Sequence, residues 1–139
     1  MPKTVQKVQE FLSDSQGGVL AILFGDHSQV AILKGPTSLS VSISLCGKEL
    51  RRQKQILGAF SGRGWFEQER SPLVTVRGRT RRVVLLRTAS ESRLLLSIRR
   101  FVEVSRGPSF TVGRTKPTIV WRRLNINLEP ARLAGYRGA

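Results

Sequence analysis

The chain has 139 residues, 40% of them hydrophobic, and carries a formal net charge of +15 with a pI near 11.7. A chain of this size can bury a real core, and such a charge points to nucleic acid, an anionic membrane surface or a very acidic protein as the partner. The longest apolar run, residues 19–24, is too short to cross a bilayer, and the single cysteine, Cys46, excludes an internal disulfide.

A helix, a three-stranded meander and a second helix are predicted within residues 1–60. The helix spans residues 4–14, and its apolar face is formed by Val5, Val8, Phe11 and Leu12. Strands are predicted at 19–24, 29–33 and 39–45, separated by turn residues. In the third strand apolar residues alternate strictly with serines, from Ser38 to Ser44, which predicts a half-buried strand with its serine face outward. The second helix is predicted over residues 48–60.

The second half repeats this pattern of strands. Strands are predicted at 73–76, 83–87 and 93–100, with turns at 77–82 and 88–92 between them. Placing Gly25 over Gly78, an offset of about 53 residues, aligns the halves without a gap and matches Val30 with Val83, which predicts an internal structural repeat. Two short strands, at 118–121 and 124–128, and one helical turn at 130–134 complete the chain.

These elements predict an α+β, mainly β fold. We expect antiparallel sheet built from two strand-meander halves, with an N-terminal helix and a central helix. Residues 1–139 are expected to form a single domain, in which residues 1–60 are a neutral scaffold half and residues 61–139 an arginine-rich half.

The positive charge is confined to one part of the chain. All eighteen arginines lie after residue 50, whereas four lysines and four carboxylates cancel within residues 1–50. Arginine outnumbers lysine eighteen to six. Because the planar guanidinium grips phosphate bidentately and stacks on rings, this bias favours phosphate binding over a merely soluble basic surface.

The two turns that the repeat superimposes differ in charge. The second carries four arginines, Arg77, Arg79, Arg81 and Arg82, whereas the first, residues 25–29, carries none. Four like charges within six residues repel one another, and the scaffold does not need them, so we expect a ligand that neutralises them.

Aromatic and basic residues adjoin at 63–66, 99–101, 121–123 and 136–137. Cations that follow the backbone and rings that stack on bases are the combination that holds single-stranded nucleic acid. Trp65, between glycine-rich neighbours, is predicted as the main stacking residue; Trp121 is equally compatible with packing, and Phe101 is expected in the core. The predicted nucleic-acid-binding residues are Arg77, Arg79, Arg81, Arg82, Arg99, Arg100, Arg122, Arg123, Arg63 and Trp65.

Nothing in the sequence indicates an enzyme, a metal or a cofactor. The single histidine, His27, lies in a predicted turn, and Cys46 ends a predicted strand. No His–Cys or His–His spacing suits a metal, and the only close carboxylates are Glu67 and Glu69. We therefore expect a non-enzymatic protein with no catalytic, metal or cofactor site and no small-molecule substrate.

Three functions fit the charge. The first is a nucleic-acid-binding protein, dominated by phosphate contacts and weakly sequence-specific, with single strands favoured over double strands and RNA not distinguished from DNA. The second is a structural, RNA-packaging component of a ribonucleoprotein or viral particle. The third is a basic interaction module for an acidic protein or a membrane surface. An intracellular protein is expected from the cysteine usage and the polar N-terminus, and homo-oligomer formation stays open.

In outline the two halves are similar to the repeated strand-and-helix modules of single-strand binders of the Whirly and Pur-alpha families. No residue motif of either family occurs in the chain, so no residue role follows from this similarity.

Overall fold

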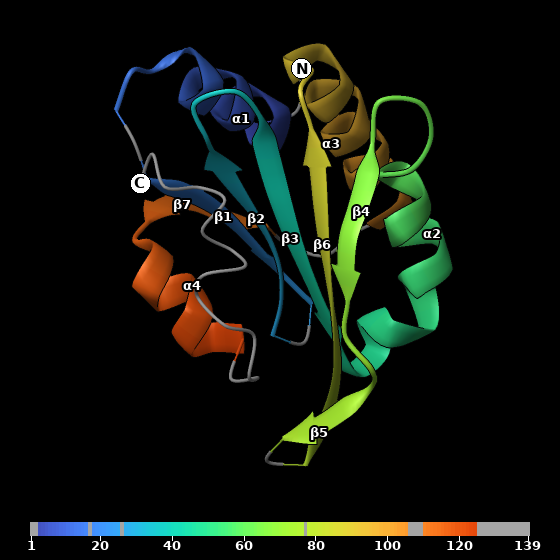
Figure 1. Ribbon diagram of the computed structural model, residues 1–139. Helices are drawn as coiled ribbons and strands as arrows, with labels where there is room; N and C mark the ends of the chain where they lie inside the picture. The colour runs from blue at the N-terminus through green and yellow to red at the C-terminus, as the bar shows by residue number, and fades with distance from the viewer. Residues whose placement is uncertain (1–2, 17, 26, 77, 106–109, 125–139) are drawn as a thin grey trace.

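The computed structural model describes residues 3–16, 18–25, 27–76, 78–105 and 110–124, which form five helices and seven strands (Figure 1). In chain order these are α1 (Lys3–Ser13), β1 (Val19–Phe24), β2 (Ser28–Lys34), β3 (Leu39–Cys46), the 3₁₀ helix η1 (Gly47–Arg52), α2 (Gln53–Ala59), β4 (Phe66–Arg70), β5 (Val74–Val76), β6 (Arg79–Thr88), α3 (Glu91–Ser105), β7 (Thr111–Thr115) and α4 (Pro117–Leu124). The α+β class, the antiparallel sheet and the N-terminal and central helices are confirmed, but helix and strand occur in about equal amounts, so the fold is not mainly β.

The strands form one antiparallel sheet in the order β4-β6-β3-β2-β1-β7, and β5 pairs with the start of β6. The predicted meander β1–β2–β3 is present, with Val19 opposite Leu33 and Gln29 opposite Ser44. β3 then pairs with β6, and β1 pairs with β7. Strands from both halves of the sequence therefore lie in the same sheet.

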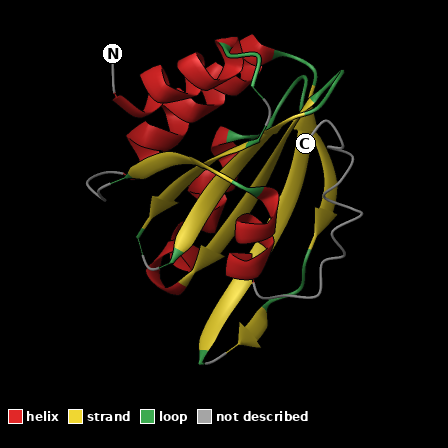
Figure 2. Cartoon of the chain, turned by 90° about the vertical axis from the view of Figure 1, so that its left-hand side faces the viewer, coloured by secondary structure: helices red, strands yellow, loops and turns green. Residues whose placement is uncertain are grey.

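Helices α1, α2 and α3 cover one face of this sheet, which we call the helical face (Figures 1 and 2). The four residues predicted for the apolar face of α1 are all buried. The main core packs them against alternate residues of β1, β2, β3 and β6 and against α2 and α3. Phe101 of α3 is fully buried in this core, as predicted.

The serines of β3 are buried, which contradicts the predicted exposed serine face. Ser40, Ser42 and Ser44 are each 0% exposed. The three serines do lie on the side of β3 opposite its apolar residues, as the alternation predicted. However, α4 lies over that second face, and a second apolar cluster forms there from Val19, Ala31, Leu33, Val83, Leu85 and Val120. The central strand is therefore covered on both sides.

The predicted strand at 93–100 is wrong, because these residues lie within helix α3. Leu94, Ile98 and Phe101 are all buried and recur at the helical spacing i, i+4 and i+7. The predicted repeat is therefore limited to the occurrence of a hairpin in each half, β1–β2 and β5–β6, whose registers differ, and the counterpart of β3 is a helix.

Two further differences concern the end of the chain and the edges of the sheet. Residues 118–121 belong to α4 and are not a strand. Edge strands β4 and β7 were not predicted, since neither has the alternating apolar pattern of a half-buried strand. The predicted strand at 124–128 begins at the last residue of α4, and its other residues lie outside the described residues, as does the helical turn predicted at 130–134.

Candidate nucleic-acid interface

A two-stranded arm extends from one end of the sheet, at the bottom of Figure 1. It consists of residues 74–76 and 79–82, with Val76 opposite Arg79 and Val74 opposite Arg81. The pairing of β3 with β6 reaches only as far as Arg81, so Arg79 and Thr80 lie beyond the end of β3. Most of the predicted turn at 77–82 is therefore strand, and three of its four predicted arginines, Arg79, Arg81 and Arg82, lie on this arm.

The turn of the arm differs in length from the turn of the first hairpin, so the predicted superposition of the two turns is wrong. Three residues separate the paired Phe24 and Ser28, whereas two separate the paired Val76 and Arg79. Gly25 has φ +55° and Gly78 has φ +77°, both in the left-handed region that favours glycine. Each turn thus contains a glycine in the left-handed region, but only the second hairpin carries arginines. Arg77 itself lies outside the described residues.

Strand alternation separates the arginines of the arm. Arg79 and Arg81 lie opposite the helical face, and Arg81 Nη1 donates to Ser44 Oγ at 2.9 Å. Arg82 lies on the helical side, half-buried, and its Nε is buried without a hydrogen-bond partner. Arg79 is exposed and makes no ion pair with any described residue. The four predicted neighbours thus do not share one surface.

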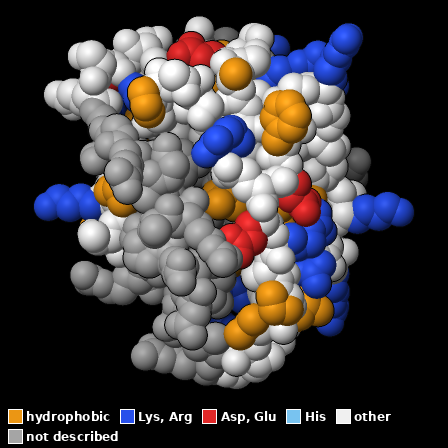
Figure 3. All heavy atoms as spheres, in the orientation of Figure 1, with side chains coloured by type: hydrophobic (Ala, Val, Ile, Leu, Met, Phe, Trp, Pro, Cys, Tyr) orange, Lys and Arg blue, Asp and Glu red, His pale blue; other side chains and the backbone are white. Residues whose placement is uncertain are grey.

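Two residues outside the predicted set share the face of Arg79 and Arg81. Arg87 lies on it by alternation, and Phe66 stands directly opposite Arg87 on the edge strand β4. Phe66 is 69% exposed, which is the highest value among the large apolar side chains described. We call Arg79, Arg81, Arg87 and Phe66 the arginine face; Figure 3 views the molecule from this side, where basic, acidic and apolar side chains are interspersed.

The remaining predicted arginines lie elsewhere. Arg99 and Arg100 are exposed on α3, which covers the helical face, so the sheet separates them from the arginine face. The backbone places Arg122 and Arg123 on α4, over the second face of the sheet, and their side chains lie outside the description. The expectation that all these arginines form one rim is therefore wrong, because it required 93–100 to be a strand.

Trp65 and Arg63 lie at the opposite end of the sheet from the arm. They precede β4, whose first residue Phe66 pairs with Arg87, whereas Arg79 at the tip of the arm pairs with Val76. Eight residues of strand separate these positions, or roughly 26 Å. The Trp65 indole is half-buried; it donates from Nε1 to Ser97 Oγ at 3.0 Å and meets Phe60 edge-on at 5.7 Å. Trp65 is therefore anchored in the helical layer.

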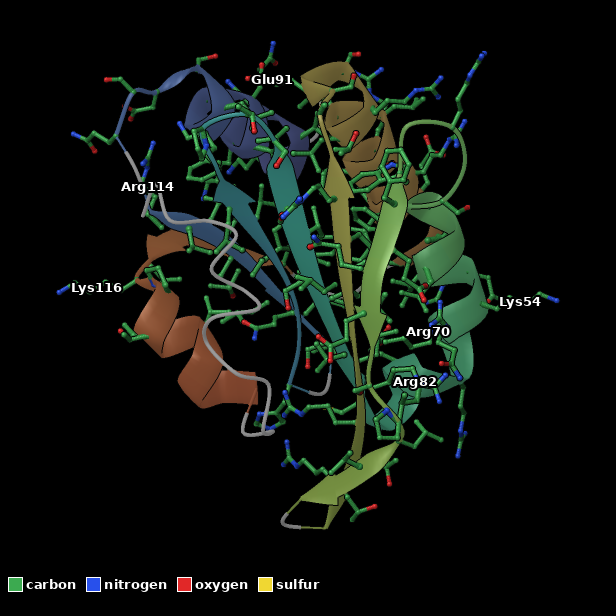
Figure 4. The ribbon with its side chains drawn as sticks, viewed as in Figure 1. Lys54, Arg70, Arg82, Glu91, Arg114 and Lys116 are labelled. Carbon is green, nitrogen blue, oxygen red and sulfur yellow. The ribbon has the colours of Figure 1, made fainter. Side chains whose placement is uncertain are left out.

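Two other arginines are neutralised within the fold. Arg114 Nη2 lies 2.7 Å from Asp14 Oδ2, and Arg70 Nη2 lies 2.7 Å from Glu67 Oε1 (Figure 4). An arginine that already pairs with a carboxylate binds phosphate less readily than an unpaired arginine, because the phosphate must first displace the carboxylate. Arg79 is thus better suited to an external anion than Arg70 or Arg114.

The Arg70–Glu67 pair predicts a pH dependence. The hydrogen bond from Arg70 holds the pKa of Glu67 below its ordinary value of 4.5, against a smaller desolvation effect that raises it. Because the folded-state pKa is depressed, the pair stabilises the fold above pH 4.5 and loses this contribution as the pH falls through the folded pKa. The variant Arg70→Gln should return the pKa of Glu67 towards 4.5, as measured by NMR titration of the Glu67 carboxyl carbon. An unchanged pKa would show that the pair does not form in solution.

A cavity of about 430 Å³ lies where the first hairpin turn meets the root of the arm. Its lining includes Arg81 of the arginine face and Gln29 of β2, which the sequence analysis did not select. The available signal was a long amide within the otherwise apolar strand 29–33, since a buried polar side chain is more informative than an exposed apolar one. His27 also lines the cavity and is exposed in the turn, where it was predicted.

The described residues contain no cluster of metal ligands and no membrane-spanning helix. No three His, Cys, Asp or Glu side chains among them gather as a metal site would require. None of the described helices is both long and apolar enough to span a membrane. No protein-family model matches the chain, and neither a curated protein nor a solved structure is significantly similar to it. Its function is therefore inferred from its own residues and their placement.

Proposed function

We propose that this protein is a non-enzymatic nucleic-acid-binding protein that contacts phosphates through its arginine face. The observation that carries the proposal is the arm, a β-ribbon that ends in an exposed arginine with no carboxylate partner among the described residues. A two-stranded ribbon with basic residues is a shape that enters nucleic-acid grooves or lies along a strand. A chain with a net charge of +15 gains most from a polyanionic partner.

Single strands are favoured because the arginine face combines cations with an exposed ring. Arg79 and Arg87 lie roughly 26 Å apart along β6, at either end of the buried residues Val83 and Leu85, so a strand that passes outside the second apolar cluster meets a cation at each end. Phe66 beside Arg87 offers a face on which one base can stack, and stacking of this kind tolerates any base. Binding of this type is weakly sequence-specific.

The salt dependence of binding tests this proposal. We expect the dissociation constant of a fluorescein-labelled twelve-nucleotide oligo-dT, measured by anisotropy, to rise steeply between 50 and 200 mM salt. Each phosphate contact contributes a slope of about −0.7 in a plot of log K against log salt for single strands. The double variant Arg79→Gln/Arg87→Gln should therefore flatten the slope by about 1.4. Arg81 is left unchanged because it also bonds to Ser44.

A matched control removes the same charge from the other side of the sheet. The variant Arg99→Gln/Arg100→Gln lowers the net charge by the same amount but on α3, so its slope should stay within error of the parent protein. If the two double variants weakened binding equally, affinity would depend on the net charge of the protein and not on the position of the arginines, and the arginine face would not be the interface. If the parent protein bound no oligonucleotide at 50 mM salt, nucleic-acid binding itself would be refuted.

A further inference from the structure

The cavity at the root of the arm is continuous with the arginine face, because Arg81 belongs to both. Its other described walls come from the first hairpin: Leu23, Phe24, Gly25, His27, Ser28 and Gln29. At about 430 Å³ its volume falls within the range of small-ligand sites. It therefore has room for one planar ring beside a surface suited to phosphates.

Gln29 carries an unusual deficit of hydrogen bonds. The residue is only 1% exposed, yet neither its side-chain oxygen nor its nitrogen has a hydrogen-bond partner. A buried amide without partners is costly, and native proteins rarely leave one unless a bound molecule completes it. Because Gln29 also lines the cavity, this amide points to a ligand with both a donor and an acceptor.

We propose that the cavity binds one unstacked nucleobase, adenine in preference to thymine, through the amide of Gln29. This inference rests on the proposed function and names the part of the nucleic acid that is recognised. A glutamine amide presents a donor and an acceptor side by side and pairs with the N6 and N7 edge of adenine. Thymine presents an acceptor and a methyl group on the corresponding edge, so the preference for adenine requires that the cavity admit this edge of the base and exclude the N3–O4 edge, where thymine also has a donor beside an acceptor.

The neighbouring residues suit the same ligand. Leu23 supplies a half-buried apolar wall. His27 is exposed in the turn, where its backbone has φ 59°. Histidine is among the side chains on which an unstacked base packs. Arg81, whose guanidinium already bonds to Ser44, adds positive charge next to the cavity, where the sugar-phosphate of the bound nucleotide would emerge.

A buried water molecule is the competing explanation for the amide, and Ser42 provides the control. Ser42 is 0% exposed, and its hydroxyl is also buried without a partner, but it does not line the cavity. The variant Ser42→Ala removes a polar group without a hydrogen-bond partner from the same face of the sheet but outside the cavity. The variant Gln29→Met removes one from the cavity while keeping a long side chain. Both should keep or raise the melting temperature, because no satisfied hydrogen bond is lost.

The test compares oligo-dA and oligo-dT of twelve nucleotides. The parent protein and Ser42→Ala should bind oligo-dA about tenfold more tightly than oligo-dT. Gln29→Met should bind both alike, with the parent's affinity for oligo-dT and its salt slope. An equal affinity of the parent protein for both strands, or a preference that survives in Gln29→Met, would overturn the base pocket while leaving the proposed function standing. Failure of the parent protein to bind either strand would instead refute the proposed function, and the pocket with it.

A second measurement on the parent protein does not depend on how the variant folds. On addition of adenosine 5′-monophosphate, the side-chain amide signals of Gln29 in a ¹⁵N–¹H spectrum should shift, and thymidine 5′-monophosphate at the same concentration should move them less. Signals that respond equally to both nucleotides, or to neither, would show that the Gln29 amide does not bind adenine in preference to thymine.

Discussion

Replacing Phe101 with alanine is expected to lower the free energy of unfolding by about 3–5 kcal/mol, the usual cost of truncating a fully buried phenylalanine. The ring of Phe101 touches three others from separate parts of the chain: Phe24 of β1 at 4.9 Å, Phe110 at 5.5 Å and Phe60 at 6.0 Å between centroids. Its loss therefore loosens α3 from both β1 and the end of α2. Urea denaturation followed by circular dichroism measures the effect.

Leu96 provides the control on the same helix. It is 38% exposed on α3, so Leu96→Ala removes little buried surface, and alanine favours helix slightly more. We expect a change within about 0.5 kcal/mol of the parent protein. If Phe101→Ala cost no more than Leu96→Ala, the packing of α3 on the sheet would be wrong. In that case residues 93–100 would not form a helix packed on the sheet.

The strands of the first half could be predicted because their period is unambiguous. β1 coincides with the predicted residues 19–24, and β3 extends the predicted 39–45 by one residue. Along β3 every second residue is a serine, which only a strand places on one side. The sequence could not show that the serine side is covered as well, because α4, which lies over it, follows some seventy residues later in the chain and was predicted as a strand.

The prediction failed for α3 because its sequence fits two periods. Between Arg93 and Arg100 three consecutive leucines are followed by Ser97 and Ile98. These apolar positions fit a strand that is buried on both faces, and they equally fit a helix with one apolar face. Length decides such cases, and the apolar pattern continues to Phe101 and Val104, which is long for a strand and ordinary for a helix. Arg99 and Arg100 were misplaced with it, and the expected single rim of arginines depended on that assignment.

For the candidate site, the sequence located the arm but not its faces. The excess of arginine at 77–82 was visible from composition, and those of its residues that the structure describes lie on the arm. Which of them share a surface depends on where β6 begins, since a shift of one residue reverses every side chain. Arg87 joins Arg79 by alternation along β6, but Phe66 joins them only through the pairing of β4 with β6, a contact between distant residues that local patterns do not report.

The two neighbouring aromatic residues Trp65 and Phe66 should have opposite effects when removed. Trp65→Ala is expected to cost about 2–4 kcal/mol in the free energy of unfolding, somewhat less than a fully buried aromatic, because the ring is half-buried. It also leaves the hydroxyl of Ser97, which is only 4% exposed, without the indole donor. Its affinity for oligo-dT, measured below the unfolding transition, should match that of the parent protein.

Phe66→Ala should do the reverse. Its side chain is 69% exposed, so the free energy of unfolding should change by less than about 1 kcal/mol. Affinity for oligo-dT should fall by about tenfold, the loss of one stacked base. Because the two residues are adjacent in sequence and both are aromatic, differences in composition or local charge cannot produce this crossed pattern. If Trp65→Ala weakened binding and Phe66→Ala did not, the bound strand would lie at the helical layer and the arginine face would have to be abandoned as the interface.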